Sequence, residues 1–149
     1  MQTITSDVLV NAPPERVFNF LVDPHNLSDI WPGIIEVKSV KKAKNNDGFK
    51  FNWDYRMAGV EFEGKCETIE YTPYERIVIK STKGLDSTVT WSLKPAGQQT
   101  QVTLTFEYQT PALVLKQMEE TAVTEENERE VKTMLQNLKN RLELEPAHA

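Results

Sequence analysis

The sequence lacks the residue patterns on which many metal, nucleotide and hydrolase sites are built. Its 149 residues include one cysteine, Cys66, and two histidines, His25 and His148. A single cysteine excludes an internal disulfide and is typical of a reducing compartment. The sequence has no HxxxH or CxxC spacing, no Gly-x-Ser-x-Gly elbow and no glycine-rich phosphate loop. We therefore predict no metal site, no cofactor and no catalytic residue from a standard motif.

Long apolar runs and basic runs are missing as well. No apolar stretch approaches the roughly 18 residues of a membrane span, and the N-terminus lacks the pattern of a signal peptide. Lysine and arginine number 17 against 22 aspartates and glutamates, which gives a net charge of -5. The longest basic run is Lys41-Lys42, which argues against nucleic acid as a partner. We expect one soluble, cytoplasmic domain over residues 1–149, and nothing in the sequence specifies an oligomeric state.

What the sequence does contain is a long amphipathic segment from Ala112 to Leu144. Its apolar stripe at helical spacing consists of Val131, Met134, Leu135, Leu138 and Leu142. An unbroken helix of this length would span about 50 Å, which is long for a compact domain of this size. We therefore predict a break at Thr121–Thr124, with Thr124 as the cap of the second part. The first part, with Leu113, Leu115 and Met118, would form a partly independent flap.

Most of the remaining chain alternates between apolar and polar residues, as strands do. From Phe49 to Met57 every second side chain is large and apolar, and Ala58-Gly59 predicts a two-residue hairpin turn. In the resulting register Gly64 faces Trp53 and leaves room for its indole. Further strands are predicted over Thr3–Val10 and Ile34–Val40 and over residues 77–83, 87–93 and 102–108. Two short helices, the second over Asn26–Trp31, would lie between the first two strands.

The fold class that follows is α+β, an antiparallel seven-stranded sheet with one long C-terminal helix. A three-residue loop at 84–86 would keep the inner faces of the two flanking strands aligned. In the resulting rows across the sheet, Cys66 would lie beside Ile79 and Trp91 beside Leu104. A second row would place Lys83, Ser87 and Tyr108 side by side.

Ligand pockets combine mainly apolar walls with a few polar groups, and the inner face has this composition. The residues predicted to bind a ligand are Trp53, Tyr55, Phe62, Ser81, Lys83, Ser87, Trp91, Phe106, Tyr108 and Met118. The competing interpretation is that each aromatic residue simply packs in the core. For Lys83, the competing interpretation is a solvated residue at the end of a strand.

Two stretches carry a resemblance to a known superfamily, VNAPPERVFNFLVDPHNLSDIWPGIIEV near the start and GFKFNWDYRMAGVEFEG in the middle. With the final strand and long helix, they resemble the START-like, or SRPBCC, superfamily, and most of all its polyketide cyclase/dehydrase and lipid-transport branch. The resemblance implies a helix-grip fold, in which the sheet wraps the C-terminal helix around a hydrophobic cavity. Members bind lipids, quinones, polyketides or plant hormones, and a few are enzymes.

Three functions remain open at this point. The first is binding of a small hydrophobic or aromatic ligand between sheet and helix. The second is an aromatase, cyclase or dehydratase acting on a polyketide, in which Tyr55, Tyr108 or Lys83 would polarise a carbonyl. The third is a protein-interaction module that uses an acidic outer sheet face. We expect the run from Asn127 to Glu130 to be a solvated helix face, and no pair of carboxylates to lie inside the cavity.

Overall fold

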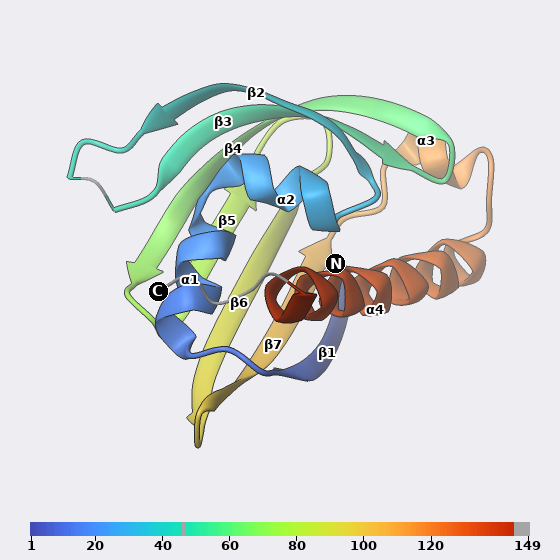
Figure 1. The fold of residues 1–149 in the computed structure, drawn as a ribbon. Coiled ribbons are helices and arrows are strands. Elements are labelled where there is room, and N and C mark those ends of the chain that lie inside the picture. The colour runs from blue at the N-terminus through green and yellow to red at the C-terminus, as the bar shows by residue number, and fades with distance from the viewer. Residues whose placement is uncertain (46, 145–149) are drawn as a thin grey trace.

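The structure is a computed structural model in which residues 1–45 and 47–144 are described. Its elements follow one another in the order shown in Figure 1: β1 Gln2–Val10, α1 Pro14–Val22, α2 Pro24–Ile30, β2 Ile34–Lys42, β3 Phe49–Met57, β4 Val60–Thr72, β5 Arg76–Ser81, β6 Ser87–Ala96, β7 Gln99–Tyr108, α3 Ala112–Leu115 and α4 Glu120–Leu144.

The seven strands form one antiparallel sheet in the order β1-β7-β6-β5-β4-β3-β2. This confirms the predicted α+β helix-grip architecture. The first strand pairs with the last, so β1 and β2 become the two edges of the sheet, and α1 and α2 connect them. Figure 1 shows the sheet curling over α4, which runs along the β1 and β7 side, while α1 lies over β5 and β6 and α2 lies beside β2.

The apolar stripe of α4 is buried against the sheet, as its spacing predicts. Val131, Met134, Leu135, Leu138 and Leu142 all belong to the core. The predicted break, however, lies earlier than Thr121–Thr124, because residues 116–119 separate α3 from α4 and Thr124 is inside the helix. The carboxylate of Glu120 accepts hydrogen bonds from Thr110 and Gln2 at 2.7 and 3.0 Å, which anchors the start of α4 to the ends of β7 and β1.

The hairpin between β3 and β4 has the register read from the sequence. Met57 faces Val60, and the turn residues Ala58 and Gly59 both have positive φ, 49° and 80°, as a tight hairpin turn of this kind requires. Gly64 faces Trp53, and a Cβ on Gly64 would collide with the indole and lie 2.8 Å from the carbonyl oxygen of Lys83. Glycine at this position is what lets the indole pack directly against β4.

The register around β5 differs from the predicted one. Cys66 faces Ser81 and Ser81 faces Ser87, whereas the predicted rows aligned Cys66 with Ile79 and Lys83 with Ser87. The loop between β5 and β6 holds five residues, 82–86, instead of three, and β4 has a register shift between Thr68 and Glu70. The predicted and the observed lengths of the loop between β5 and β6 are both odd, so the same side chains of β5 still face inward. The residue that each of them faces on the neighbouring strand, however, differs from the predicted one by two positions.

The second helix begins two residues earlier than predicted. Pro24 occupies its first position, which suits a residue without a backbone N–H, and the Asp23 side chain accepts a hydrogen bond from the His25 backbone at 3.0 Å. Asp23-Pro24 is therefore a helix start as well as a helix stop. No helix in the described part of the chain is both long and apolar enough to cross a membrane.

Candidate functional site

The interior of the curled sheet is organised around the indole of Trp31, which follows α2. Its ring makes edge-to-face contacts with Trp53 and Tyr55 on β3 and with Phe106 on β7, at centroid distances of 5.4, 5.5 and 5.5 Å. Three strands separate β3 from β7 in the sheet. Because one side chain touches both strands, the sheet must be strongly curled, and Trp31 occupies the middle of its concave face. Only 2% of Trp31 is exposed.

A chain of hydrogen bonds connects this indole to α4. Trp31 Nε1 donates to the Tyr55 hydroxyl at 3.1 Å, and the hydroxyl donates to Glu130 Oε1 at 3.3 Å. The same carboxylate oxygen accepts from the Gly33 backbone at 3.0 Å. Gly33 has no side chain to interfere, since a Cβ there would lie 2.5 Å from Glu130 Oε1. The loop after α2, strand β3 and helix α4 are thus joined at one carboxylate.

Burial changes the acidity of both groups in this chain. Removal from water raises the pKa of Glu130 above its ordinary value, and the hydrogen bonds from Gly33 and Tyr55 oppose that rise. Burial also raises the pKa of Tyr55 well above its ordinary value, with the neighbouring Glu130 charge acting in the same direction. Tyr55 therefore remains a neutral hydroxyl, while Glu130 takes up a proton more readily than an exposed glutamate does.

Several other polar groups in the interior have no partner. Among the described residues, six buried side-chain polar atoms lack a hydrogen bond: Trp53 Nε1, Ser81 Oγ, Ser87 Oγ, Trp91 Nε1, Tyr108 OH and Asn127 Nδ2. Ser81, Ser87 and Tyr108 face one another in sequence across β5, β6 and β7. Native proteins keep few buried polar groups unsatisfied. All six atoms are able to donate, so the interior offers donors that lack acceptors.

Comparison with known families gives a match over almost the whole chain. Residues 1–143 match the family described as polyketide cyclase / dehydrase and lipid transport. The chain belongs to this family. Comparison with proteins of curated function gives no match.

Solved structures with the same fold include one described as an aromatase/cyclase and one described as a START superfamily protein. TTHA0849 from Thermus thermophilus has a TM-score of 0.81 and 20% identity, over 96% of this chain and 98% of its own. The Zhui aromatase/cyclase from Streptomyces sp. R1128 has a TM-score of 0.76 and 16% identity, over 99% and 98%. A START superfamily protein from Mycobacterium smegmatis has a TM-score of 0.73 and 14% identity, over 94% of this chain and 98% of its own. At these identities the likeness shows the fold.

In this member of the polyketide cyclase / dehydrase and lipid transport family, most of the predicted ligand-binding residues are buried in the interior. They are Trp53, Tyr55, Ser81, Ser87, Trp91, Phe106 and Tyr108. Phe62 and Met118 are half-buried and pack against the same core. Lys83 is exposed in the loop after β5, so the prediction that it shares an inner row with Ser87 is wrong. A role of the other nine residues in binding stays a prediction.

Three interior residues are missing from the set predicted from the sequence: Trp31, Asn127 and Glu130. The run from Asn127 to Glu130 was expected to be solvated, but Asn127 is only 4% exposed and Glu130 is half-buried. The signal was available, because four-residue steps back from Val131 and Met134 reach Asn127 and Glu130 on the same helix face. Trp31 follows the last turn of α2, where no periodicity indicates which way a side chain points.

The groups with metal-binding or nucleophilic chemistry lie elsewhere or are inert. In residues 1–45 and 47–144 no cluster of three or more histidine, cysteine, aspartate or glutamate side chains has the geometry of a metal site. His25 is exposed and its ring contacts Asp23, and His148 lies outside the described residues. Burial raises the pKa of the Cys66 thiol to about 12, which keeps it protonated.

Proposed function

We propose that the interior between the sheet and α4 binds a small hydrophobic ligand that carries acceptor oxygens, such as a quinone, a flavonoid-like phenol or a polyketide. The observation that carries the proposal is the set of six buried donor atoms without partners, on an otherwise aromatic and aliphatic lining. Ligand sites combine mainly apolar walls with a few polar groups that fix orientation. Membership of a family described by polyketide cyclisation and lipid transport supports the same ligand class.

A ligand of this kind can reach the interior only if Trp31 moves. The indole fills the centre of the concave face, where its three ring contacts lie. Trp31 is followed by Pro32 and Gly33, outside any helix or strand, so it can swing without breaking a regular element. When Trp31 moves, it loses its hydrogen bond to Tyr55 and its ring contacts. A ligand with an aromatic face and an acceptor oxygen would replace the lost ring contacts and the lost hydrogen bond.

The proposal is tested by titration of intrinsic fluorescence. All three tryptophans of the chain lie in this interior, so a bound quinone or phenol is expected to quench nearly all of their emission with micromolar affinity. The Trp31→Ala variant removes the indole that fills the interior, and it is expected to bind the ligand at least as tightly as the wild-type protein does. Tyr108→Phe is expected to weaken the binding of ligands that carry a carbonyl group, while the binding of a hydrocarbon of the same size is unaffected. Native mass spectrometry of protein from its own host would identify the ligand.

Two results would contradict the proposal. If neither the wild-type protein nor a folded Trp31→Ala variant binds any member of a lipid, quinone and polyphenol panel, the interior is a solid core and the proposal is wrong. A ligand that binds without changing tryptophan emission would occupy a different site and would also contradict it.

A second candidate function is catalysis on a polyketide, and Glu130 is the observation that favours it. A half-buried carboxyl group with a raised pKa, hydrogen-bonded to a buried tyrosine, is an arrangement suited to proton transfer. Tyr55 would polarise a substrate carbonyl, and Glu130 would accept or return the proton during cyclisation or loss of water. The chain's likeness to an aromatase/cyclase structure supports this candidate.

The test separates turnover from binding. Glu130→Gln preserves the size of the side chain and an acceptor oxygen for Gly33 and Tyr55, but it removes the proton-accepting carboxylate. With a poly-β-ketone substrate, catalysis through Glu130 predicts a loss of at least about 100-fold in kcat with little change in KM. Unchanged kcat would reject the catalytic role and leave the binding function as the better description.

A further inference from the structure

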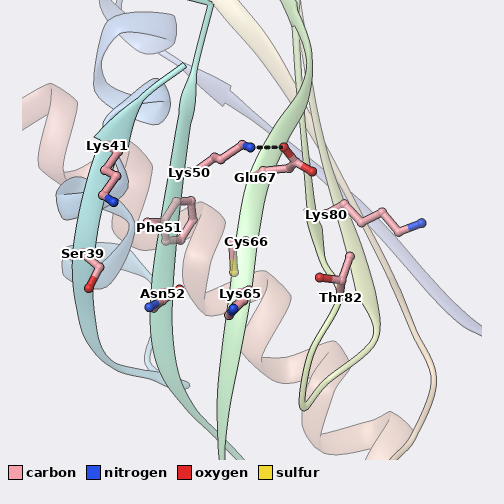
Figure 2. A pocket seen from close by; sticks show the side chains of 10 residues that line it. All are labelled: Ser39, Lys41, Lys50, Phe51, Asn52, Lys65, Cys66, Glu67, Lys80 and Thr82. Atoms are coloured by element: carbon pink, nitrogen blue, oxygen red, sulfur yellow. Dashed lines mark ion pairs between the residues drawn. The ribbon is translucent and has the colours of Figure 1, made fainter. Parts of the chain in front are cut away.

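The outer face of the sheet carries four lysines around a hollow, on the side opposite the interior. Figure 2 shows Lys41, Lys50, Lys65 and Lys80 on β2, β3, β4 and β5, spread around a depression of about 400 Å³. The strand register brings them together: Lys41 faces Lys50, Lys50 faces Glu67, and Glu67 faces Lys80. The expectation of an acidic outer face is wrong in this region.

The charges in this cluster are poorly compensated. Lys50 lies 3.8 Å from Glu67, a loose and exposed ion pair, and Lys41, Lys65 and Lys80 have no ion pair with any described residue. Like charges directly opposite one another, as in Lys41 and Lys50, destabilise a sheet. Lysines on an edge strand protect it from aggregation, but only β2 of these four strands is an edge. The remaining three lysines need another explanation, in a chain whose net charge is -5.

The hollow between the lysines has the size and lining of a small-ligand site. Ser39, Asn52 and Thr82 contribute neutral hydrogen-bonding groups to it. Its volume falls in the usual range of ligand pockets, about 300–1,000 Å³. The hollow lies beside a distortion of β2, which has a register shift between Lys38 and Lys41 and a positive φ of 56° at Ser39. A serine in this conformation is strained, and such strain is often kept where a site needs it.

We propose that this hollow binds a small anion that carries two or three linked phosphoryl groups. Ammonium groups and neutral hydroxyl or amide donors are the groups that hold phosphoryl oxygens. Adjacent strands are about 4.8 Å apart, so the lysines of β2 to β5 span about 14 Å, a length suited to an oligophosphate and too wide for one phosphate. Lys80 points away from the hollow in Figure 2, and its flexible side chain turns inward when the anion binds.

The surroundings argue against a larger polyanion. Glu36, Asp54 and Glu63 lie on the same outer face, next to the lysine cluster along β2, β3 and β4. Nucleic acid binds through an extended basic surface, because each phosphate in contact needs its own cation. Here the basic region is small and bordered by carboxylates, which repel a continuous phosphate backbone and leave a compact anion unaffected.

The experiment is a calorimetric titration with inorganic tripolyphosphate at low ionic strength, accompanied by mapping of backbone amide shifts. The expected result is saturable binding, weakened by added salt, with shifts confined to β2–β5. Lys65→Gln and Lys80→Gln are each expected to lower the affinity about fivefold, the effect of one ion contact at about 4 Å in water. Lys94→Gln is the matched control, since Lys94 is an exposed outer-face lysine on β6, away from the hollow. It should leave the affinity unchanged.

The outcomes are decisive because the substitutions are on the surface and a thermal melt verifies that each variant is folded. The proposal is overturned by an absence of binding or by an equal loss in Lys94→Gln, which would indicate attraction by overall charge. It is also overturned if an oligonucleotide or polyglutamate of equal charge binds more tightly than tripolyphosphate. None of these results bears on ligand binding in the interior, which lies on the other face of the sheet.

Discussion

Tyr55 and Tyr108 offer a controlled comparison of a paired and an unpaired hydroxyl in the same interior. Both side chains are fully enclosed, with 1% and 0% exposed. The Tyr55 hydroxyl accepts from Trp31 at 3.1 Å and donates to Glu130 at 3.3 Å, whereas the Tyr108 hydroxyl has no partner. The substitution of each tyrosine by phenylalanine deletes one oxygen atom and leaves the ring in place. The two variants should therefore differ only through hydrogen bonding.

Tyr55→Phe leaves Trp31 Nε1 without an acceptor inside the protein and removes one of the donors to Glu130. A buried donor left unsatisfied costs about 1–3 kcal/mol, and Glu130 retains the bond from Gly33. We expect a loss of about 2–3 kcal/mol in the free energy of unfolding. For a chain of about 150 residues this lowers Tm by about 4–12 °C. Tyr108→Phe removes a hydroxyl that has no partner, and we expect stability to be unchanged or higher by about 1 kcal/mol.

Urea unfolding of the two ligand-free variants measures both numbers, with the m-value as a check that the unfolded state is unaltered. A double variant, Tyr55→Phe with Glu130→Gln, should cost less than the sum of the single changes, because the two residues share a hydrogen bond. The reasoning is refuted if Tyr108→Phe is as destabilising as Tyr55→Phe. In that case the distinction between the paired and the unpaired hydroxyl would be false.

Two further predictions concern Glu130 and Gly64. Because burial raises the pKa of Glu130, the folded state binds a proton more tightly than the unfolded state, so wild-type stability should fall as pH rises from about 4.5 through the raised value. Glu130→Gln lacks this dependence, and its stability relative to wild type should increase over that pH window, as unfolding at a series of pH values would show; a constant difference would contradict the argument. Gly64→Ala places a Cβ 2.8 Å from the Lys83 carbonyl oxygen and against the Trp53 indole, and it should cost about 1–3 kcal/mol by thermal unfolding. A neutral Gly64→Ala would mean that the indole does not pack directly against β4.

The parts of the fold that the sequence predicts correctly are those fixed by local chemistry. The turn at Ala58-Gly59 sets the register of β3 and β4 within a few residues, and the alternation from Phe49 to Met57 decides which face is buried. The pairing of β6 with β7 also follows the prediction, with Trp91 facing Leu104 and Ser87 facing Tyr108. In each case a tight turn leaves only one register that buries every large side chain.

Predictions that depend on loop length are less accurate for a physical reason. Alternation is unchanged by a shift of two residues, so it gives the face of Ser81 correctly and its partner incorrectly. The same limit places Lys83 on the inner face, because counting alone cannot tell a strand end from the start of a five-residue loop. The start of α4 is held to the sheet by hydrogen bonds from Thr110 and Gln2 to Glu120, which a helical repeat does not reveal.

The candidate site is the least predictable part, because its central residues belong to segments with no period. Trp31 follows a short helix, and its position becomes defined only when β3 and β7 curl close enough to contact the same indole. Glu130 lies on a helix face that is apolar at Val123, Val131 and Met134, so a carboxylate there breaks the pattern that predicts burial. Glu130 breaks the apolar pattern of this face, yet it is bonded to the loop after α2 and to β3. Burying its carboxylate there costs stability. That cost is the reason to look for function at Glu130 and Trp31 before the better-packed aromatic residues around them.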